Sequence, residues 1–185
     1  PAAMCGSLAA DVDGRLIGMT FEGDFNTGAY ASWGPTVATR VPVHASGPYL
    51  TPNYRATSRA IHTNGPTAGA FRGFGVPQAA ICQEVLYDDL AGKCGIDRLE
   101  FRRLNALRDG DTTPSGQVLQ AVGIEECLDA LKPHWDRALA EAAAHNEVSP
   151  VLKRGIGVAS CWYGCGNPAL PNPSTIRIGI TSGGA

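Results

Sequence analysis

The 185-residue chain lacks the marks of a membrane protein, a secreted precursor or a nucleic-acid-binding protein. No apolar run approaches the roughly 18 residues of a membrane span, and no charged and apolar regions of a signal peptide open the chain. Its 15 Lys and Arg are balanced by 17 Asp and Glu and form no basic run. We therefore expect neither nucleic acid nor a membrane among its partners.

Protein-borne metal sites and the common nucleotide motifs are also missing. The C-x3-C pair Cys161 and Cys165 fits neither a zinc ribbon nor an iron–sulfur run. No G-x-S-x-G, P-loop or dinucleotide fingerprint is present. The histidines lack ligand spacing, so we expect structural or solvated roles for His44, His62, His134 and His145. Three cysteines fall in helical patterns, which suits free buried thiols in a reduced, cytoplasmic compartment: Cys82, Cys94 and Cys127.

What the chain does have is a glycine-rich loop at residues 63–78, TNGPTAGAFRGFGVPQ. Its four glycines let the backbone come close to another group. Arg72 stands between two phenylalanines, offering a cation beside flat apolar faces. The loop leads into a helix, whose N-terminal amides favour anions. By spacing alone it is a binding site for an unknown ligand.

Turn residues and alternation predict the strands. Asp13-Gly14 between residues 7–11 and 15–22 predicts a β-hairpin. Residues 24–43 should form a strand and then a loop over a pocket, followed by a connector at 47–53. Residues 54–63, 153–160 and 175–181 alternate and are predicted to be strands.

Helical spacing predicts the helices. Pro77 should open a helix that Gly95 ends, and Asp97 with Glu100 should cap a second helix running to about residue 107. In the first helix, an apolar face should be buried: Ile81, Cys82, Val85, Leu86 and Leu90. The opposite face should be solvated: Gln83, Glu84, Asp88 and Lys93.

The later part of the chain continues this mixture of elements. Residues 108–117 should be a polar linker. Residues 123–131 and 135–146 are helical by pattern, with Pro133 kinking or restarting the helix. Strands and helices without regular β-α-β alternation predict an α+β fold.

The literal sequence of the loop, GAFRGFGVPQ, resembles the signature loop of the large subunit of molybdenum hydroxylases, the xanthine dehydrogenase and aldehyde oxidase family. The resemblance runs from about residue 28 to about residue 111, through VATR, GPYLTPNYRATSRAIHTN and GIDRLEFRRLNALRDGD. It implies a molybdenum–pterin cofactor (molybdopterin, including its cytosine dinucleotide form). Iron–sulfur clusters, and in some members FAD, would lie on other domains or subunits.

The resemblance also assigns residues to the cofactor. In the family, the backbone N–H at the position of Arg72 hydrogen-bonds an oxygen ligand of molybdenum. The neighbouring cofactor contacts would be Ala70, Phe71 and Gly73. The residues alone leave open a loop-stabilising Arg72 and a core Phe71.

On the substrate side, Phe74 matches an aromatic ring that stacks on the substrate. Arg40, 32 residues before Arg72, matches an arginine that contacts a substrate oxygen and stabilises transition-state charge. Trp33 and Thr36 would line the same funnel. An ordinary exposed Arg40 and a buried core Trp33 remain alternatives.

The resemblance implies one segment of an enzyme that hydroxylates an N-heterocycle, purine or nicotinate-like, or oxidises an aldehyde, using oxygen from water. Residues 1–120 would close the first cofactor-binding domain and residues 121–185 would open the second. The start at Pro1 suggests a piece of a longer polypeptide, with the general-base glutamate outside it. Expected partners are the other segments of the subunit, iron–sulfur and flavin subunits, and further copies in an oligomer. A non-catalytic ligand-binding module and one chain of a split-subunit enzyme are the alternatives.

Overall fold

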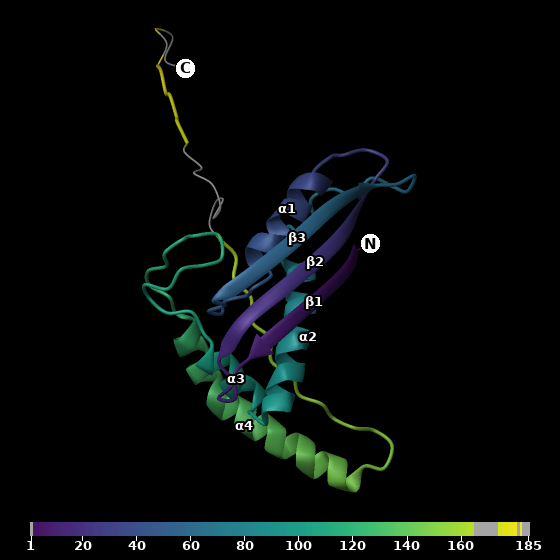
Figure 1. Ribbon diagram of the computed structural model, residues 1–185, viewed down its shortest axis with the longest axis vertical. Helices are drawn as coiled ribbons and strands as arrows, with labels where there is room; N and C mark the ends of the chain where they lie inside the picture. Colours follow the sequence, from purple (N-terminus) through teal and green to yellow (C-terminus); the bar gives the residue numbers. More distant parts are fainter. Residues whose placement is uncertain (1, 165–173, 181, 183–185) are drawn as a thin grey trace.

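A three-stranded sheet with helices on one face forms the body of the protein (Figure 1). The computed structural model describes residues 2–164, 174–180 and 182. The strands lie in the order β1-β2-β3, with bounds Ala2–Ala10, Leu16–Gly28 and Asn53–His62. β1 and β2 are antiparallel, as the predicted hairpin requires, whereas β2 and β3 are parallel. The α+β class is confirmed.

Two helices cover the sheet, and the main core lies beneath them. A parallel strand pair needs a crossover, which here passes through α1 (Gly34–His44). α2 (Val76–Cys94) lies beside α1 on the same face (Figure 1). The core between sheet and helices comprises Met19, Phe21, Phe25, Ala38, Val41, Ala45 and Ala79.

The predicted loop within residues 24–43 is wrong, because α1 forms there. Pro35 suits the first turn of a helix, but Pro42 removes an amide that would bond to Ala38 O. β3 compensates, since Ser58 Oγ donates to Ala38 O at 2.7 Å and Tyr54 Oη donates to Pro42 O at 2.5 Å. A helix interrupted by proline is thus completed by side chains that follow it in the chain.

The predicted helix at α2 is confirmed, but its predicted faces are partly wrong. Ile81 and Val85 are 65% and 59% exposed. Gln83 and Glu84 are buried instead. The reason is Arg102, fully buried on α3, whose Nε donates to Glu84 Oε2 at 2.8 Å. Buried charges are retained where they are paired. Cys82, Leu86 and Leu90 do pack against the core as predicted.

α3 (Arg98–Leu104) begins at the predicted cap. The Asp97 carboxylate accepts from the amides of Leu99 and Glu100 at 2.9 and 3.1 Å. Just beyond the helix, Asn105 is buried and reaches back to the hairpin. Its Oδ1 accepts from Leu16 N at 2.9 Å, and its Nδ2 donates to Gly14 O at 3.0 Å.

α4 (Ile124–Val148) is one helix that continues through Pro133, so the predicted kink or restart is wrong. It packs on α3 through Leu128 and Trp135, which meet Leu99 and Ala106. The packed partner stabilises the helix despite the lost hydrogen bond. In the described part of the chain, no helix is long and apolar enough to cross a membrane.

The strands predicted at 153–160 and 175–181 are not found in residues 153–160 and 174–180. Thr181 lies outside the described residues. A strand requires a hydrogen-bonding neighbour, and the described sheet ends at β1 and β3. The alternation of apolar and polar residues is therefore not sufficient to make these segments strands.

Candidate cofactor and substrate site

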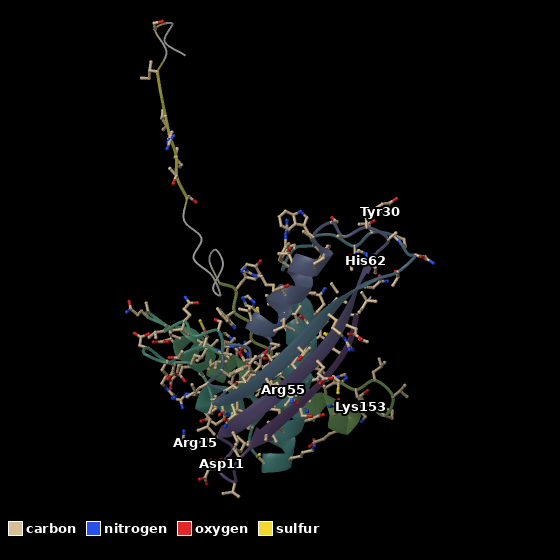
Figure 2. All side chains as sticks on the ribbon, turned by 45° about the horizontal axis from the view of Figure 1, so that its top comes forward. Asp11, Arg15, Tyr30, Arg55, His62 and Lys153 are labelled. Atoms are coloured by element: carbon tan, nitrogen blue, oxygen red, sulfur yellow. The ribbon has the colours of Figure 1, made fainter. Side chains whose placement is uncertain are left out.

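The glycine-rich loop leaves the sheet beside the end of β2. Because β2 and β3 are parallel, both end at the same edge, where Gly28 is paired with His62. Ala29 N donates to Gly65 O at 3.1 Å and Ala68 N to Thr27 O at 3.0 Å. Figure 2 shows Tyr30 and His62 at this end of the sheet, far from the hairpin turn at Asp11 and Arg15. The loop is therefore anchored to the rigid sheet.

An aromatic pair brings the loop and α1 together. The rings of Trp33, at the N-cap of α1, and Phe74 meet edge to face, with centroids 6.1 Å apart. Phe74 has φ +46°, an uncommon conformation for a residue with a side chain. Trp33 is 58% exposed and Phe71 is 81% exposed, so the buried-core alternatives do not hold. This pair of an exposed Trp33 and a half-buried Phe74 can accept a flat ligand ring.

The backbone of the loop offers a row of open donors. The amides of residues 69–73 donate no hydrogen bond to any other described residue. The side chain of Arg72 is exposed. Within the described residues, no group of three or more His, Cys, Asp or Glu side chains could hold a metal. The donor set thus suits anionic or oxygen ligands carried by a cofactor rather than a bare ion.

A cavity of about 280 Å³ lies between this loop, α1 and the sheet. The buried Oε1 of Gln78 has no hydrogen-bond partner among the described residues. Gln78 lies in the first turn of α2, directly after Pro77. The cavity is lined by Phe25, Asn26, Val37, Ala68, Gly69 and Gln78, among others.

The remaining predicted residues lie along α1. Trp33, Thr36 and Arg40 have i, i+3, i+7 spacing and therefore share one side of the helix. Thr36 is exposed. The guanidinium of Arg40 is held: Nη2 donates to Gly164 O at 3.2 Å, and its carbon lies 4.7 Å from the ring centre of Tyr163. The structure thus brings Phe74 to Trp33 at one end of α1 and Tyr163 to Arg40 further along.

Sequence reasoning missed the partners of Arg40. His44, one turn after Arg40, is buried and packs against Trp162 and Tyr163. Burial lowers the pKa of its imidazole, while the hydrogen bond with Arg40 O acts in the opposite direction. The i, i+4 spacing of Arg40 and His44 was the available signal. Cys161 is an exposed free thiol, and Cys165 lies outside the described residues. Cys82 and Cys94 are partly buried, but Cys127 is exposed, so the prediction of a buried thiol is wrong there.

Comparisons with known proteins show which family this chain resembles. A family model described as the molybdopterin cofactor-binding domain matches residues 1–106. The nicotinate dehydrogenase large molybdopterin subunit of Eubacterium barkeri is 46% identical over 130 residues, which cover 70% of this chain and 31% of that protein. The aldehyde oxidoreductase of Megalodesulfovibrio gigas is 36% identical over 166 residues, covering 90% of this chain and 18% of that protein.

A solved structure shows the same fold. The aldehyde oxidoreductase from Desulfovibrio desulfuricans superposes with a TM-score of 0.76 at 32% identity, covering 81% of this chain and 16% of that one. This chain therefore spans less than a third of the length of each of these proteins. Since the family model covers more than half of the sequence, the chain belongs to the molybdopterin cofactor-binding domains of the molybdenum hydroxylase family.

Proposed function

We propose that this chain forms part of an enzyme that hydroxylates an N-heterocycle, purine or nicotinate-like, or oxidises an aldehyde, with oxygen from water. The observation that carries the proposal is the row of open amides at residues 69–73 beside the Trp33–Phe74 pair. Relatives named for nicotinate and for aldehydes support both substrate classes.

The loop backbone would hold the cofactor. The N–H of Arg72 would donate to an oxygen of the bound cofactor, and the neighbouring backbone of Ala70, Phe71 and Gly73 would hold the same group. When bound, the cofactor supplies the oxygen transfer and takes up the two electrons that the substrate loses. The buried Oε1 of Gln78 is a further acceptor at this place. Backbone donors on an anchored loop need no reorganisation during the reaction.

The side chains would hold and polarise the substrate. Phe74 and Trp33 offer aromatic faces and edges to a flat ring or an aryl group. Thr36 lines the same side of α1. Arg40 places a permanent positive charge where a substrate oxygen gains negative charge. Because the general base lies outside this chain, these residues form one wall of the active site.

The larger assembly is also part of the proposal. Residues 1–120 would belong to a first cofactor-binding domain and residues 121–185 to a second. The remaining parts of the subunit, with iron–sulfur and in some cases flavin subunits, would carry electrons to an acceptor, in a homo- or hetero-oligomer. The free thiols at Cys5, Cys82, Cys94, Cys127 and Cys161 support a reducing, cytoplasmic compartment.

Molybdenum content and isotope transfer test the function. We expect stoichiometric molybdenum by elemental mass spectrometry in the natively purified assembly. We also expect the heavy isotope of labelled water in the product from nicotinate, hypoxanthine or benzaldehyde. A metal-free assembly that turns over none of the three would instead indicate a non-catalytic binding module.

A matched pair of variants tests the backbone role of Arg72. Arg72→Ala keeps the amide and should retain molybdenum, whereas Arg72→Pro removes the N–H and should lose most of it. Thermal unfolding of both variants checks that the proline has not unfolded the protein. If Arg72→Ala loses as much metal as a folded Arg72→Pro, the side chain and not the amide is the cofactor contact.

A further inference from the structure

The backbone N–H and C=O of one residue, Gly164, are both bound by side chains of α1. Arg40 Nη2 donates to Gly164 O at 3.2 Å, and Gly164 N donates to His44 Nε2 at 3.5 Å. Arg40 and His44 are one helical turn apart and so lie above one another on the same face. We call the contacts of these two residues with residues 162–164 the Gly164 clamp.

The hydrogen bonds fix the tautomer of His44. Since Nε2 accepts from an amide, the proton must lie on Nδ1, which faces Arg40 O at 3.1 Å and donates to it. The ring centre lies 4.6 Å from that of Trp162 and 5.6 Å from that of Tyr163. His44 is only 2% exposed, which favours the neutral ring. His44 therefore connects the backbone of Arg40 to residues 162–164, which also bind the Arg40 side chain.

The side chain of Arg40 is fixed by the same segment. Its guanidinium lies 4.7 Å from the ring centre of Tyr163, within the range of a cation–π interaction. An arginine side chain free in solvent has many rotamers, and fixing it costs entropy. Tyr163 and Gly164 O together select one of them before any substrate arrives.

We infer that His44 and Tyr163 are positioning residues for Arg40. They hold its guanidinium in the orientation in which it can meet a substrate oxygen, so their effect on the reaction passes through Arg40. The inference rests on the proposed function, in which Arg40 stabilises negative charge. Tyr163 is 51% exposed, so replacing it should leave the core intact.

A double-mutant cycle in the holoenzyme tests the route of the effect. Tyr163→Leu removes the aromatic face and should lower kcat by about threefold to thirtyfold, with a smaller change in KM. Tyr163→Phe keeps the face and should behave like the wild type. In an Arg40→Met background, Tyr163→Leu should cause no further loss. An equal loss in both backgrounds, or no loss in either, would overturn the inference.

A second measurement needs no turnover. His44→Phe keeps an aromatic ring but cannot accept from Gly164 N or donate to Arg40 O. We expect faster amide hydrogen exchange at residues 162–164 in this variant, measured by mass spectrometry of the holoenzyme. The control variant His134→Phe, at an exposed position, should leave the exchange of these residues unchanged. Unchanged exchange in His44→Phe would overturn the clamp. Faster exchange in an assembly without activity would support the clamp and count against the proposed function.

Discussion

A glycine determines how closely the glycine-rich loop approaches α1. Gly75, the N-cap of α2, has φ +97°, a region that residues with side chains rarely enter. A Cβ there would lie 2.8 Å from Val41 Cγ2 and 2.9 Å from Val37 O. Both distances are too short, and the second involves backbone that cannot rotate away. Any side chain at this position must therefore push the loop from the helix.

Gly75→Ala should lower the free energy of unfolding by about 1–3 kcal/mol, because it adds both backbone strain and overlap. Gly92→Ala is the matched control within the same helix, where an added Cβ meets nothing within 4 Å. It should stabilise the protein by up to about 1 kcal/mol. Urea unfolding measures both. Equal values for the two variants would contradict this account of Gly75.

At the residue scale, the features that the sequence predicted are those whose signal lies in adjacent residues. The glycines and Arg72 marked the loop, and Phe74 does lie beside Trp33. The contacts of Arg40 with Tyr163 and Gly164 were not predictable, because they join residues more than 120 positions apart. A local pattern carries no information about such distant partners.

At the scale of elements, a buried charge pair reverses part of the expected orientation of α2. Arg102 of α3 is fully buried and bonds to Glu84, which also accepts from Tyr49 Oη at 2.9 Å. The carboxylate thus has partners from two other segments of the chain. Periodicity places charged residues toward solvent, so this pair could not be read from either helix alone.

Arg102→Met should destabilise the fold by about 3–5 kcal/mol, since it leaves Glu84 buried and without its cation. Arg103→Met, its exposed neighbour on α3, should destabilise the fold far less, because water screens the ion pairs of Arg103. Adding Glu84→Met to Arg102→Met should recover much of the loss. Chemical unfolding of the three variants measures these changes. Similar losses in the free energy of unfolding for the two single variants would show that burial of the Arg102–Glu84 pair does not determine its contribution.

Elements with local signals were predictable. The Asp13-Gly14 hairpin, the start of α2 and the Asp97 cap all appeared as predicted, because turn and cap chemistry resides in a few adjacent residues. α1 was not predictable, since Ser58 and Tyr54 of β3 compensate for Pro42. The predictions of strands at 153–160 and 175–181 failed for a related reason, since a strand pairs with residues that are distant in the sequence.

At the scale of the whole molecule, the Gly164 clamp links α1 to the last part of residues 2–164 through a neutral histidine. Burial lowers the pKa of His44 below its ordinary 6.5. The unfolded chain then binds a proton at a higher pH than the folded protein does. This contribution to stability is complete above the ordinary pKa and is lost as the pH falls toward the folded value.

We therefore expect the free energy of unfolding to decrease as the pH is lowered from about 7.5 to about 5, more steeply in the wild type than in His44→Phe. Equilibrium unfolding at several pH values gives the two slopes. A variant that remains as steep as the wild type would show that other groups cause the decline. His134→Phe, on the exposed side of α4, should keep the wild-type slope.

In a newly synthesised chain, the contacts of Asn105 with the hairpin can form only late. Its side chain bonds to Leu16 N and Gly14 O, across 89 positions from Leu16. A ribosome adding roughly 5–20 residues per second needs about 4 to 18 seconds to cover that distance. During this interval the hairpin turn cannot make these bonds, and the apolar side of β2 stays uncovered until first α1 and then α2 have been made. The nascent segment is then a natural client for chaperones that bind chains during synthesis.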